Sequence, residues 1–379
     1  MMITERLISD AKFYNKVIAV ILAKEDVITD KLKGTPLSRR VVTLLVDPEE
    51  HPDYLIRLTR GVLPSVSVIT PDMKLLGIIE SNEPSYILTS LRDLITQYDD
   101  KKLTPVKLPP FIPEPVEPTE ASIYEVIGKV LDGAPADFRV VELMSTIVRL
   151  EKRFSKAMEK LTPMDEVAKF FLGKGELKGE FAIYEAVKSI SGRSSKVLEY
   201  VEDGKVYRSS KKENYGLLID ESVVGYALLT EYMRKGDDSL LDIATKIKDF
   251  VKSNLEAEKG FLDVVPKDPL TQIPYLEPLA NAEAGIFFSA LWEATGDEEV
   301  KRMALKALGV ASTRLSYLGV GARVGHALLR LNHGVLTSEP GNYEDVRVML
   351  NKKTGCKYKQ GEKCSERLED FQSSLGLED

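Results

Sequence analysis

The spacing of apolar residues changes near residue 120, which predicts two structurally different parts of the chain. Before that point, four short apolar runs rich in β-branched residues are typical of buried strands. These runs are 16–22, 40–46, 65–69 and 74–80. After it, apolar residues recur every three or four positions, as in helices packed on one face. The clearest such segments are 122–131, 139–160, 163–172 and 180–190. We therefore expect a small α/β domain followed by an all-helical domain.

Helices should alternate with the strands of the first part. Asp47 and the prolines after it resemble a helix start and lead into a helix ending near Thr59. A second helix is expected over 85–97. The resulting order, β-α-β-α-β-β-α, predicts a mixed central sheet. The proline-rich stretch 104–118 forbids a continuous helix and predicts a semi-rigid linker.

Two helical hairpins repeat in the second part, about sixty residues apart, a spacing that suggests hairpins arrayed side by side. Each has a helix ending in Gly-Asp and then a further helix. Gly236 and Gly296 suit the position after a helix that requires positive φ. Asp237 and Asp297 can then accept hydrogen bonds from the first turn of the next helix.

Several of these stretches resemble one known family. Val46–Asp53 and Leu63–Asp72 resemble the thioredoxin-like domain of the spermatogenesis-associated protein 20 type, which carries a six-hairpin-glycosidase-like α/α toroid after it. The helical repeat resembles that toroid, as do Leu217–Asp220, Gly260–Asp263 and Pro278–Asn281. The resemblance implies a thioredoxin-like domain over 1–103, a linker over 104–119, a toroid over 120–340 and a cysteine-containing tail over 341–379.

Two departures limit what the resemblance implies. The Cys-x-x-Cys of thioredoxin chemistry would fall at about 23–28, where the chain reads Ala-Lys-Glu-Asp-Val-Ile, and without a thiolate no disulfide exchange is expected. Pro64 resembles the family's cis-proline and is expected here to define a turn.

A closed toroid of twelve helices takes well over roughly 300 residues, whereas 120–337 offers about 220. The ring is therefore expected to be incomplete or its first hairpins shortened.

Toroids of this kind place polar side chains around a central cleft. Carboxylates there serve as acid and base in glycoside hydrolysis, and aromatic rings stack on sugar faces. The candidates are Asp220, Glu221, Tyr226, Asp263, Tyr275, Asn281 and Glu283. Asp220 and Asn281 also suit a purely structural role as helix caps. His326 and His333 share a helix face and could act as acid and base, although His333 also suits a helix C-terminus.

Cys356 and Cys364 flank a lysine-rich turn near the C-terminus. The family often ends with such a pair before a short helix, so the resemblance implies a short helix over 365–375. A local disulfide or two free thiols are both compatible with the sequence. A structural zinc site would need four ligands, so no metal site is expected.

Composition narrows the choice of function. The net charge of −7 argues against nucleic-acid binding. No apolar run is long enough for a membrane span, and Met1–Asp10 is too polar for a secretory signal, so a cytoplasmic protein is expected. Abundant Lys and Glu with scarce Gln is a thermophile-like bias.

The leading hypothesis is a non-redox family member that needs no cofactor and binds a carbohydrate-like small molecule in the toroid cleft. If it is an enzyme, glycosidase or epimerase chemistry is expected. The alternative is a catalytically silent scaffold that recruits a protein partner. A thiol oxidoreductase is disfavoured by the missing cysteines.

Overall fold

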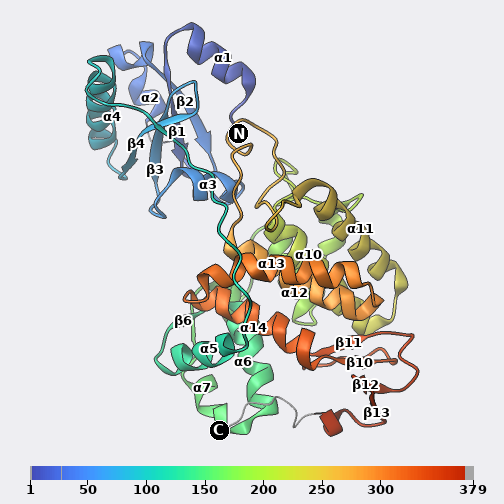
Figure 1. The fold of residues 1–379 in the computed structure, drawn as a ribbon. Coiled ribbons are helices and arrows are strands. Elements are labelled where there is room, and N and C mark those ends of the chain that lie inside the picture. Colours follow the sequence, from blue (N-terminus) through green and yellow to red (C-terminus); the bar gives the residue numbers. More distant parts are fainter. Residues whose placement is uncertain (1, 27, 372–379) are drawn as a thin grey trace. The chain divides into compact units, whose positions relative to one another are not determined.

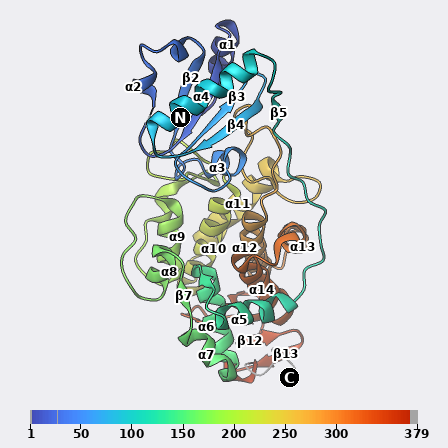
Figure 2. The same cartoon turned by 90° about the vertical axis from the view of Figure 1, so that its left-hand side faces the viewer.

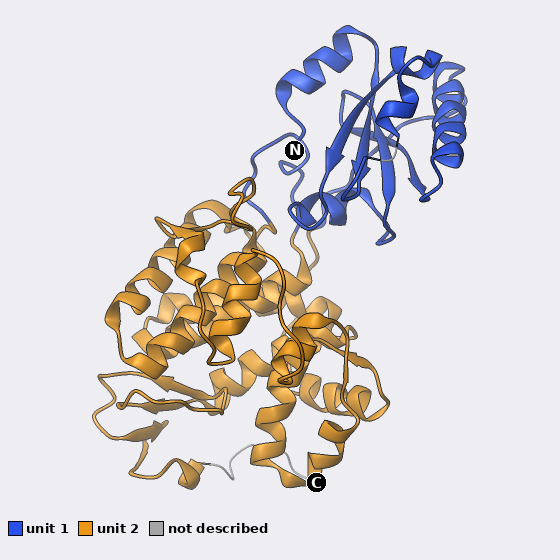
Figure 3. Ribbon diagram, turned by 180° about the vertical axis from the view of Figure 1, so that it is seen from behind, with its two compact units in different colours: residues 1–111, 264–275 blue, residues 112–263, 276–379 orange. Residues whose placement is uncertain are grey.

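The computed structural model describes residues 2–26 and 28–371, and the chain divides into two compact units (Figure 3). Unit 1 comprises residues 1–111 and 264–275, and unit 2 comprises residues 112–263 and 276–379. The segment 264–275 thus belongs to unit 1, although the sequence analysis assigned it to the helical domain at 120–340. The expected linker at 104–119 is also divided, since its first residues belong to unit 1.

Unit 1 has a sheet with helices on both faces (Figures 1 and 2). In chain order its elements are α1 Glu5–Phe13, β1 Val17–Leu22, α2 Thr29–Leu32, β2 Val41–Val46, α3 Pro52–Leu58, β3 Ser65–Ile69, β4 Lys74–Glu80, α4 Pro84–Asp99 and β5 Val106–Lys107. The four expected strands are all present. Helix α1 was not predicted from the sequence.

The sheet of unit 1 is mixed, with the order β2-β1-β3-β4-β5. β1 pairs with β2 in parallel and with β3 in antiparallel orientation. All six residues of β1 are buried, because successive side chains enter different cores. Ala19 and Ile21 pack with Leu91 of α4, while Ile18 and Val20 belong to a second core. The expected mixed sheet is therefore confirmed.

The second core of unit 1 includes a segment from far along the chain. Leu270 is fully buried in that core. Tyr54 Oη donates to Asp268 Oδ2 at 2.9 Å, and Arg57 Nη2 donates to the Ile273 carbonyl at 3.1 Å. These bonds span more than two hundred residues of sequence, which is why a pattern read along the chain did not assign the segment to unit 1.

Unit 2 is mainly helical. Its helices are α5 Ala121–Leu131, α6 Phe138–Leu150, α7 Ser155–Glu159, α8 Glu166–Phe171, α9 Ala182–Ile190, α10 Leu218–Lys235, α11 Asp238–Leu255, α12 Pro278–Thr295, α13 Glu298–Ala311 and α14 Leu318–His333. Its strands are β6 Pro135–Ala136, β7 Thr162–Pro163, β8 Val201–Glu202, β9 Lys205–Val206, β10 Val335–Thr337, β11 Val348–Leu350, β12 Tyr358–Gln360 and β13 Lys363–Ser365. The expected single helix over 139–160 is broken after Leu150 into α6 and α7.

The helices of unit 2 form a closed circuit of neighbours. α9 packs on α10, α10 on α12, α12 on α14, α14 on α6, α6 on α8, and α8 on α9. Three further helices pack outside the circuit, each chiefly on one member: α11 on α10, α13 on α12 and α5 on α14. Side chains of the circuit that face away from these outer helices therefore meet in a common interior.

The repeated Gly-Asp turns are confirmed. Gly236 follows α10 with φ +68°, and Gly296 follows α12 with φ +75°. Asp237 accepts from Ser239 N at 3.0 Å and Asp297 accepts from Glu299 N at 2.9 Å, so each aspartate caps the following helix.

The C-terminal part of unit 2 differs from the expected tail. A four-stranded sheet with the order β11-β10-β12-β13 replaces it. The short helix expected over 365–375 is wrong for its described part, because Ser365 ends β13 and only one 3-10 turn, Leu368–Phe371, follows. Residues 372–379 lie outside the described part. Within 2–26 and 28–371, no helix is both long and apolar enough to cross a membrane.

Candidate functional site

A chain of buried ion pairs occupies the interior of the unit 2 circuit. Arg139 of α6 donates to both carboxylate oxygens of Glu283 of α12, at 3.0 Å from Nε and 2.8 Å from Nη2. Its Nη1 donates to Glu142 Oε2 at 2.7 Å. Arg323 of α14 donates to Glu283 Oε1 at 2.7 Å and also binds Asp137. Moving an unpaired ion out of water costs several kcal/mol, so these charges are tolerable only because they are matched.

Sequence spacing explains why these groups converge. Arg139 and Glu142 lie three residues apart on α6, and Arg323, His326 and Arg330 lie at positions i, i+3 and i+7 of α14. Such positions share one face of a helix. Each helix therefore turns a stripe of charged side chains toward the interior of the circuit.

Glu142, Tyr226 and His326 meet at one end of this chain of ion pairs. The Tyr226 hydroxyl lies 3.4 Å from Glu142 Oε1 and 3.4 Å from His326 Nε2, and His326 Nε2 lies 3.2 Å from Glu142 Oε2. The rings of Tyr226 and His326 pack edge to face. His326 Nδ1 has no hydrogen-bond partner in the described residues.

Burial and neighbouring charges set the protonation states of these three groups. Burial disfavours the ionised form of Glu142, but Arg139 and His326 more than offset it and lower the Glu142 pKa to about 2. Burial and the Glu142 charge raise the pKa of Tyr226 above its ordinary value. Burial also lowers the pKa of His326. At neutral pH, the Glu142 carboxylate is therefore ionised, whereas the Tyr226 phenol and the His326 imidazole are neutral.

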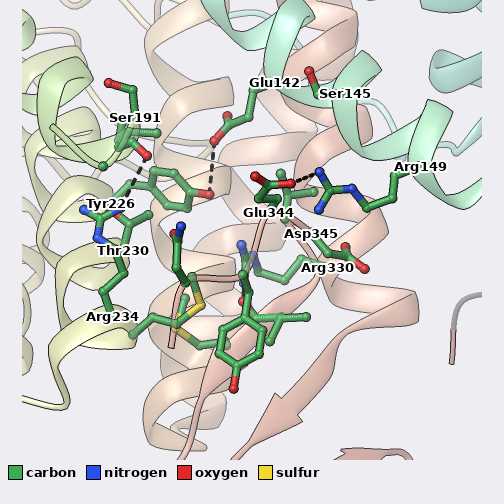
Figure 4. Close-up of a pocket in the computed structure, with 18 of the residues that line it drawn as sticks. Glu142, Ser145, Arg149, Ser191, Tyr226, Thr230, Arg234, Arg330, Glu344 and Asp345 are labelled. Atoms are coloured by element: carbon green, nitrogen blue, oxygen red, sulfur yellow. Dashed lines mark hydrogen bonds and ion pairs between the residues drawn. The ribbon is translucent and has the colours of Figure 1, made fainter. Parts of the chain in front are cut away.

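A pocket of about 340 Å³ opens beside this group (Figure 4). It is lined by Glu142, Ser145, Arg149, Phe171, Ile190, Ser191, Gly192, Tyr226, Thr230, Met233, Arg234, Arg330, Asn342, Tyr343, Glu344, Asp345, Val346, Val348 and Met349. Most of these residues come from the last turns of α6, α9, α10 and α14, and from the loop between β10 and β11. Figure 4 shows the Tyr226 hydroxyl and the Glu142 carboxylate pointing toward one another in its wall.

The remaining charges at the pocket come from several elements. Arg330 Nη1 donates to Glu293 Oε2 at 2.8 Å, while its Nε has no partner in the described chain. Asp345 accepts from Arg347, which is buried behind it, at 2.8 Å. Arg149 and Glu344 form an ion pair near the pocket mouth, where both side chains are partly exposed.

The residues predicted from the sequence do not form one site. Tyr226 lines the pocket, and Glu283 lies behind it in the chain of ion pairs. Asp220 binds Arg208 Nη1 at 2.6 Å, and Glu221 accepts from the Val206 amide at 2.8 Å. Tyr275 belongs to unit 1, where its ring stacks on Phe111.

Asp263 and Asn281 hold loops of unit 2 in place. The Asp263 carbonyl accepts from Leu218 N at 2.8 Å. The Asn281 amide group accepts from Phe261 N and donates to the Phe261 carbonyl, at 3.0 and 2.9 Å. The expectation that Asp220 and Asn281 cap helices is wrong, because the N-cap residues of α10 and α12 are Leu217 and Glu277.

Sequence reasoning missed most of the pocket. Glu142, Arg234 and Arg330 were not candidates, although a signal for two of them was present. Glu142 interrupts the apolar run Val140–Met144, and Arg330 follows His326 by one turn, directly after the apolar residues 327–329. A charge at a buried helical position indicates a buried ion pair or a site.

Two further features bear on chemistry. The Leu63–Pro64 peptide bond is cis, and Cys356 and Cys364 form a disulfide between the start of the β12–β13 hairpin and β13. Over the described ranges, no group of three or more His, Cys, Asp or Glu side chains could hold a metal ion.

The geometry favours binding over acid–base catalysis. A glycosidase needs one carboxyl group in the site that keeps its proton near neutral pH. Arg139 and His326 hold the pKa of the lining residue Glu142 near 2. Glu293, whose pKa burial raises, does not line the pocket. Glu344 and Asp345 are each paired with an arginine. The pocket thus offers a strong hydrogen-bond acceptor in Glu142 and strong donors in its arginines.

Comparison with known proteins does not assign the site. No protein-family model matches the chain, and a search of curated proteins finds no significant match.

Proposed function

We propose that unit 2 binds a small, carbohydrate-like molecule in the pocket beside Glu142, without redox chemistry. The observation that carries this proposal is the meeting of an ionised carboxylate, a phenol and a buried guanidinium in one pocket wall. Sugar hydroxyls both donate and accept hydrogen bonds, so they can donate to Glu142 and accept from Arg330 and Tyr226. The volume, about 340 Å³, is near the lower end for ligand pockets and suits a molecule of monosaccharide size.

We further infer that the chain is a divergent, shortened member of the thioredoxin-like and six-hairpin-toroid family. The strand order β2-β1-β3-β4, with helices on both faces of the sheet (Figures 1 and 2), supports the first half of this assignment. The closed circuit of unit 2 helices supports the second. No cysteine stands at 23–28, so we expect the chain not to reduce insulin disulfides.

A thermal-shift screen against monosaccharides, polyols and sugar phosphates tests the binding proposal, because a ligand that binds only the folded state raises its melting temperature. Ser145→Trp places a large ring in the pocket from a half-buried position on α6. Ser155→Trp makes the same change at an exposed position on α7 outside the pocket. Hits should disappear in Ser145→Trp and persist in Ser155→Trp. Hits that survive in both variants would place the binding site elsewhere.

One observation favours a second candidate, a catalytically silent scaffold. The interior of the circuit is filled by Arg139, Glu283 and Arg323 at the level of their ion pairs, so any cleft there is shallow. A screen with no hits against the wild-type protein would favour this candidate. Its test is a search for a protein partner by cross-linking in the source cells.

A further inference from the structure

The charges around the pocket are unevenly distributed between two walls. On one side, the ion pairs run Asp137, Arg323, Glu283, Arg139, Glu142. This chain begins and ends with a carboxylate, so it holds one more negative than positive charge while His326 stays neutral. Glu142 is its end at the pocket. The first wall is therefore anionic and suits hydroxyl groups that donate hydrogen bonds.

Arg234 of α10 supplies the opposite charge on another wall. Its guanidinium donates to the carbonyls of Ser189 and Ile190 at the end of α9. It forms no ion pair within the described residues. Glu231, the carboxylate that acts on the Arg234 pKa, is already bound to Lys235 and Ser189.

Other arginines around the interior have carboxylate partners and Arg234 does not. Burial lowers the pKa of Arg234, and Glu231 offsets this only in part. By contrast, carboxylates hold the pKa values of Arg139 and Arg323 above the ordinary value. A bound anion would relieve the unmatched charge of Arg234.

Arg330 lies close to Tyr226 and adds a hydrogen-bond donor to the pocket. It is paired with Glu293, whose carboxylate holds the pKa of Arg330 above its ordinary value in spite of burial. The Nε of Arg330 also lacks a partner in the described chain, although the residue is 1% exposed and lines the pocket. An unused buried donor in a pocket wall is a position for a ligand acceptor.

We propose that the ligand is a sugar acid: a monosaccharide-sized polyol whose carboxylate or phosphate binds at Arg234 and whose hydroxyls bind at Glu142. This rests on the proposed function and specifies its ligand class. Planar guanidinium groups bind carboxylate and phosphate through paired hydrogen bonds, which accounts for arginine in this position. Arg149 does not have this role, because Glu344 already neutralises it at the surface.

Calorimetric titration with matched sugars tests this inference. The probes are glucose, glucuronate and glucose 6-phosphate, with galactose, galacturonate and galactose 6-phosphate as a second series, all at one ionic strength. The wild-type protein should bind an acidic sugar about tenfold or more tightly than the neutral sugar of its series. The two acidic probes distinguish a carboxylate ligand from a phosphate ligand.

Variants of Arg234, with a matched arginine elsewhere in unit 2 as control, make the test specific. Arg234→Gln should reduce the preference for the acidic sugar to within about twofold of the neutral one, while Arg234→Lys should keep part of it. Arg302→Gln, a matched change at an exposed arginine of α13 outside the pocket, should keep all of it. Affinity for the neutral sugar reports whether Arg234→Gln leaves the pocket intact.

The outcomes separate this inference from the proposed function. Equal affinity for neutral and acidic sugars, in the wild-type protein, would overturn the sugar-acid assignment and leave sugar binding in place. The same holds if Arg234→Gln keeps the full preference. No binding by any probe of either series would overturn both proposals.

Discussion

Glu283 is the residue on which the interior of unit 2 most depends, because two guanidinium groups share its carboxylate. Glu283→Gln removes the charge but keeps the shape, and leaves Arg139 and Arg323 facing each other with one carboxylate fewer. Breaking a buried pair in this way typically costs about 3–5 kcal/mol. We expect a loss of that size in the free energy of unfolding, measured by urea denaturation.

Glu344 provides the matched control for this substitution. It also pairs with an arginine, but its side chain is 67% exposed and that of Arg149 is 40% exposed. Exposed pairs contribute about 0–1 kcal/mol, so Glu344→Gln should change stability little. Similar losses in both variants would show that the interior charges are not buried as described.

His326 should make stability depend on pH in weakly acidic solution. Its pKa is lowered in the folded state, so below about pH 6.5 the unfolded chain takes up a proton that the folded chain does not. Stability therefore falls as pH falls through this range, by at most about 1.4 kcal/mol per pH unit. Glu142, with its pKa near 2, adds a further loss only below about pH 4.5.

The variant His326→Gln isolates this effect, because the glutamine amide can still donate to Glu142. The quantity to measure is the difference in unfolding free energy between wild type and variant from pH 8 to pH 5. Glu293, whose pKa is raised, acts in the opposite direction in both proteins and cancels in this difference. The wild type should lose stability relative to the variant as the pH falls. A constant difference would mean that His326 titrates normally in the folded protein.

At the residue scale, sequence reasoning could place helices but not their partners. Tyr226 and Glu283 were chosen because toroids carry polar residues near helix starts, and both do lie at or behind the pocket. Asp220 and Asn281 satisfied the same criterion and instead bind neighbouring loops. A buried polar side chain can bind a backbone amide or line a cavity. Which of the two occurs depends on how distant segments pack together, and a local sequence pattern does not show that packing.

At the element scale, the two Gly-Asp turns allow a matched comparison of one substitution. Both glycines have positive φ, which costs an L-residue about 1–2 kcal/mol. A Cβ on Gly296 would meet no atom within 4 Å, whereas a Cβ on Gly236 would lie 2.6 Å from Pro340 Cγ. Gly296→Ala should therefore cost about 1 kcal/mol, and Gly236→Ala more. Urea denaturation of both variants checks the order, and equal losses would contradict the close approach of Pro340.

The elements predicted from the sequence are those with a long, regular pattern. Four of the five strands of unit 1 and the helices around the Gly-Asp turns were located because apolar spacing and turn residues agree there. Strands β10 to β13 were missed because each has three residues, too few to show alternation. Their pairing positions the loop between β10 and β11, which lines the pocket. The shortness of these strands therefore explains why neither the sheet nor the pocket residues of this loop were predicted.

At the scale of the whole molecule, the chain leaves unit 1 after residue 111 and forms residues 112–263 of unit 2. It then returns to unit 1 for the twelve residues 264–275 before completing unit 2. Contacts such as the hydrogen bond between Tyr54 and Asp268 close a long loop of the chain. The residues within that loop show no pattern that predicts such contacts. The domain boundaries expected at 103 and 120 followed from the proline-rich stretch, the change in apolar spacing and the family resemblance. They could not include 264–275, whose place depends on Leu270, Asp268 and Ile273 rather than on local pattern.

Two leucine substitutions test this division of the chain. Leu270 and Leu276 lie six residues apart and are 0% and 1% exposed, but the first belongs to unit 1 and the second to unit 2. Each change to Ala should cost about 2–5 kcal/mol, through lost burial and the cavity left behind. Local stability differs between cooperative units, so hydrogen exchange can show which unit loses it. Leu270→Ala should speed exchange of the amides of β1 and β3 most, and Leu276→Ala those of α12. Faster exchange confined to α12 in both variants would mean that 264–275 is part of the helical unit after all.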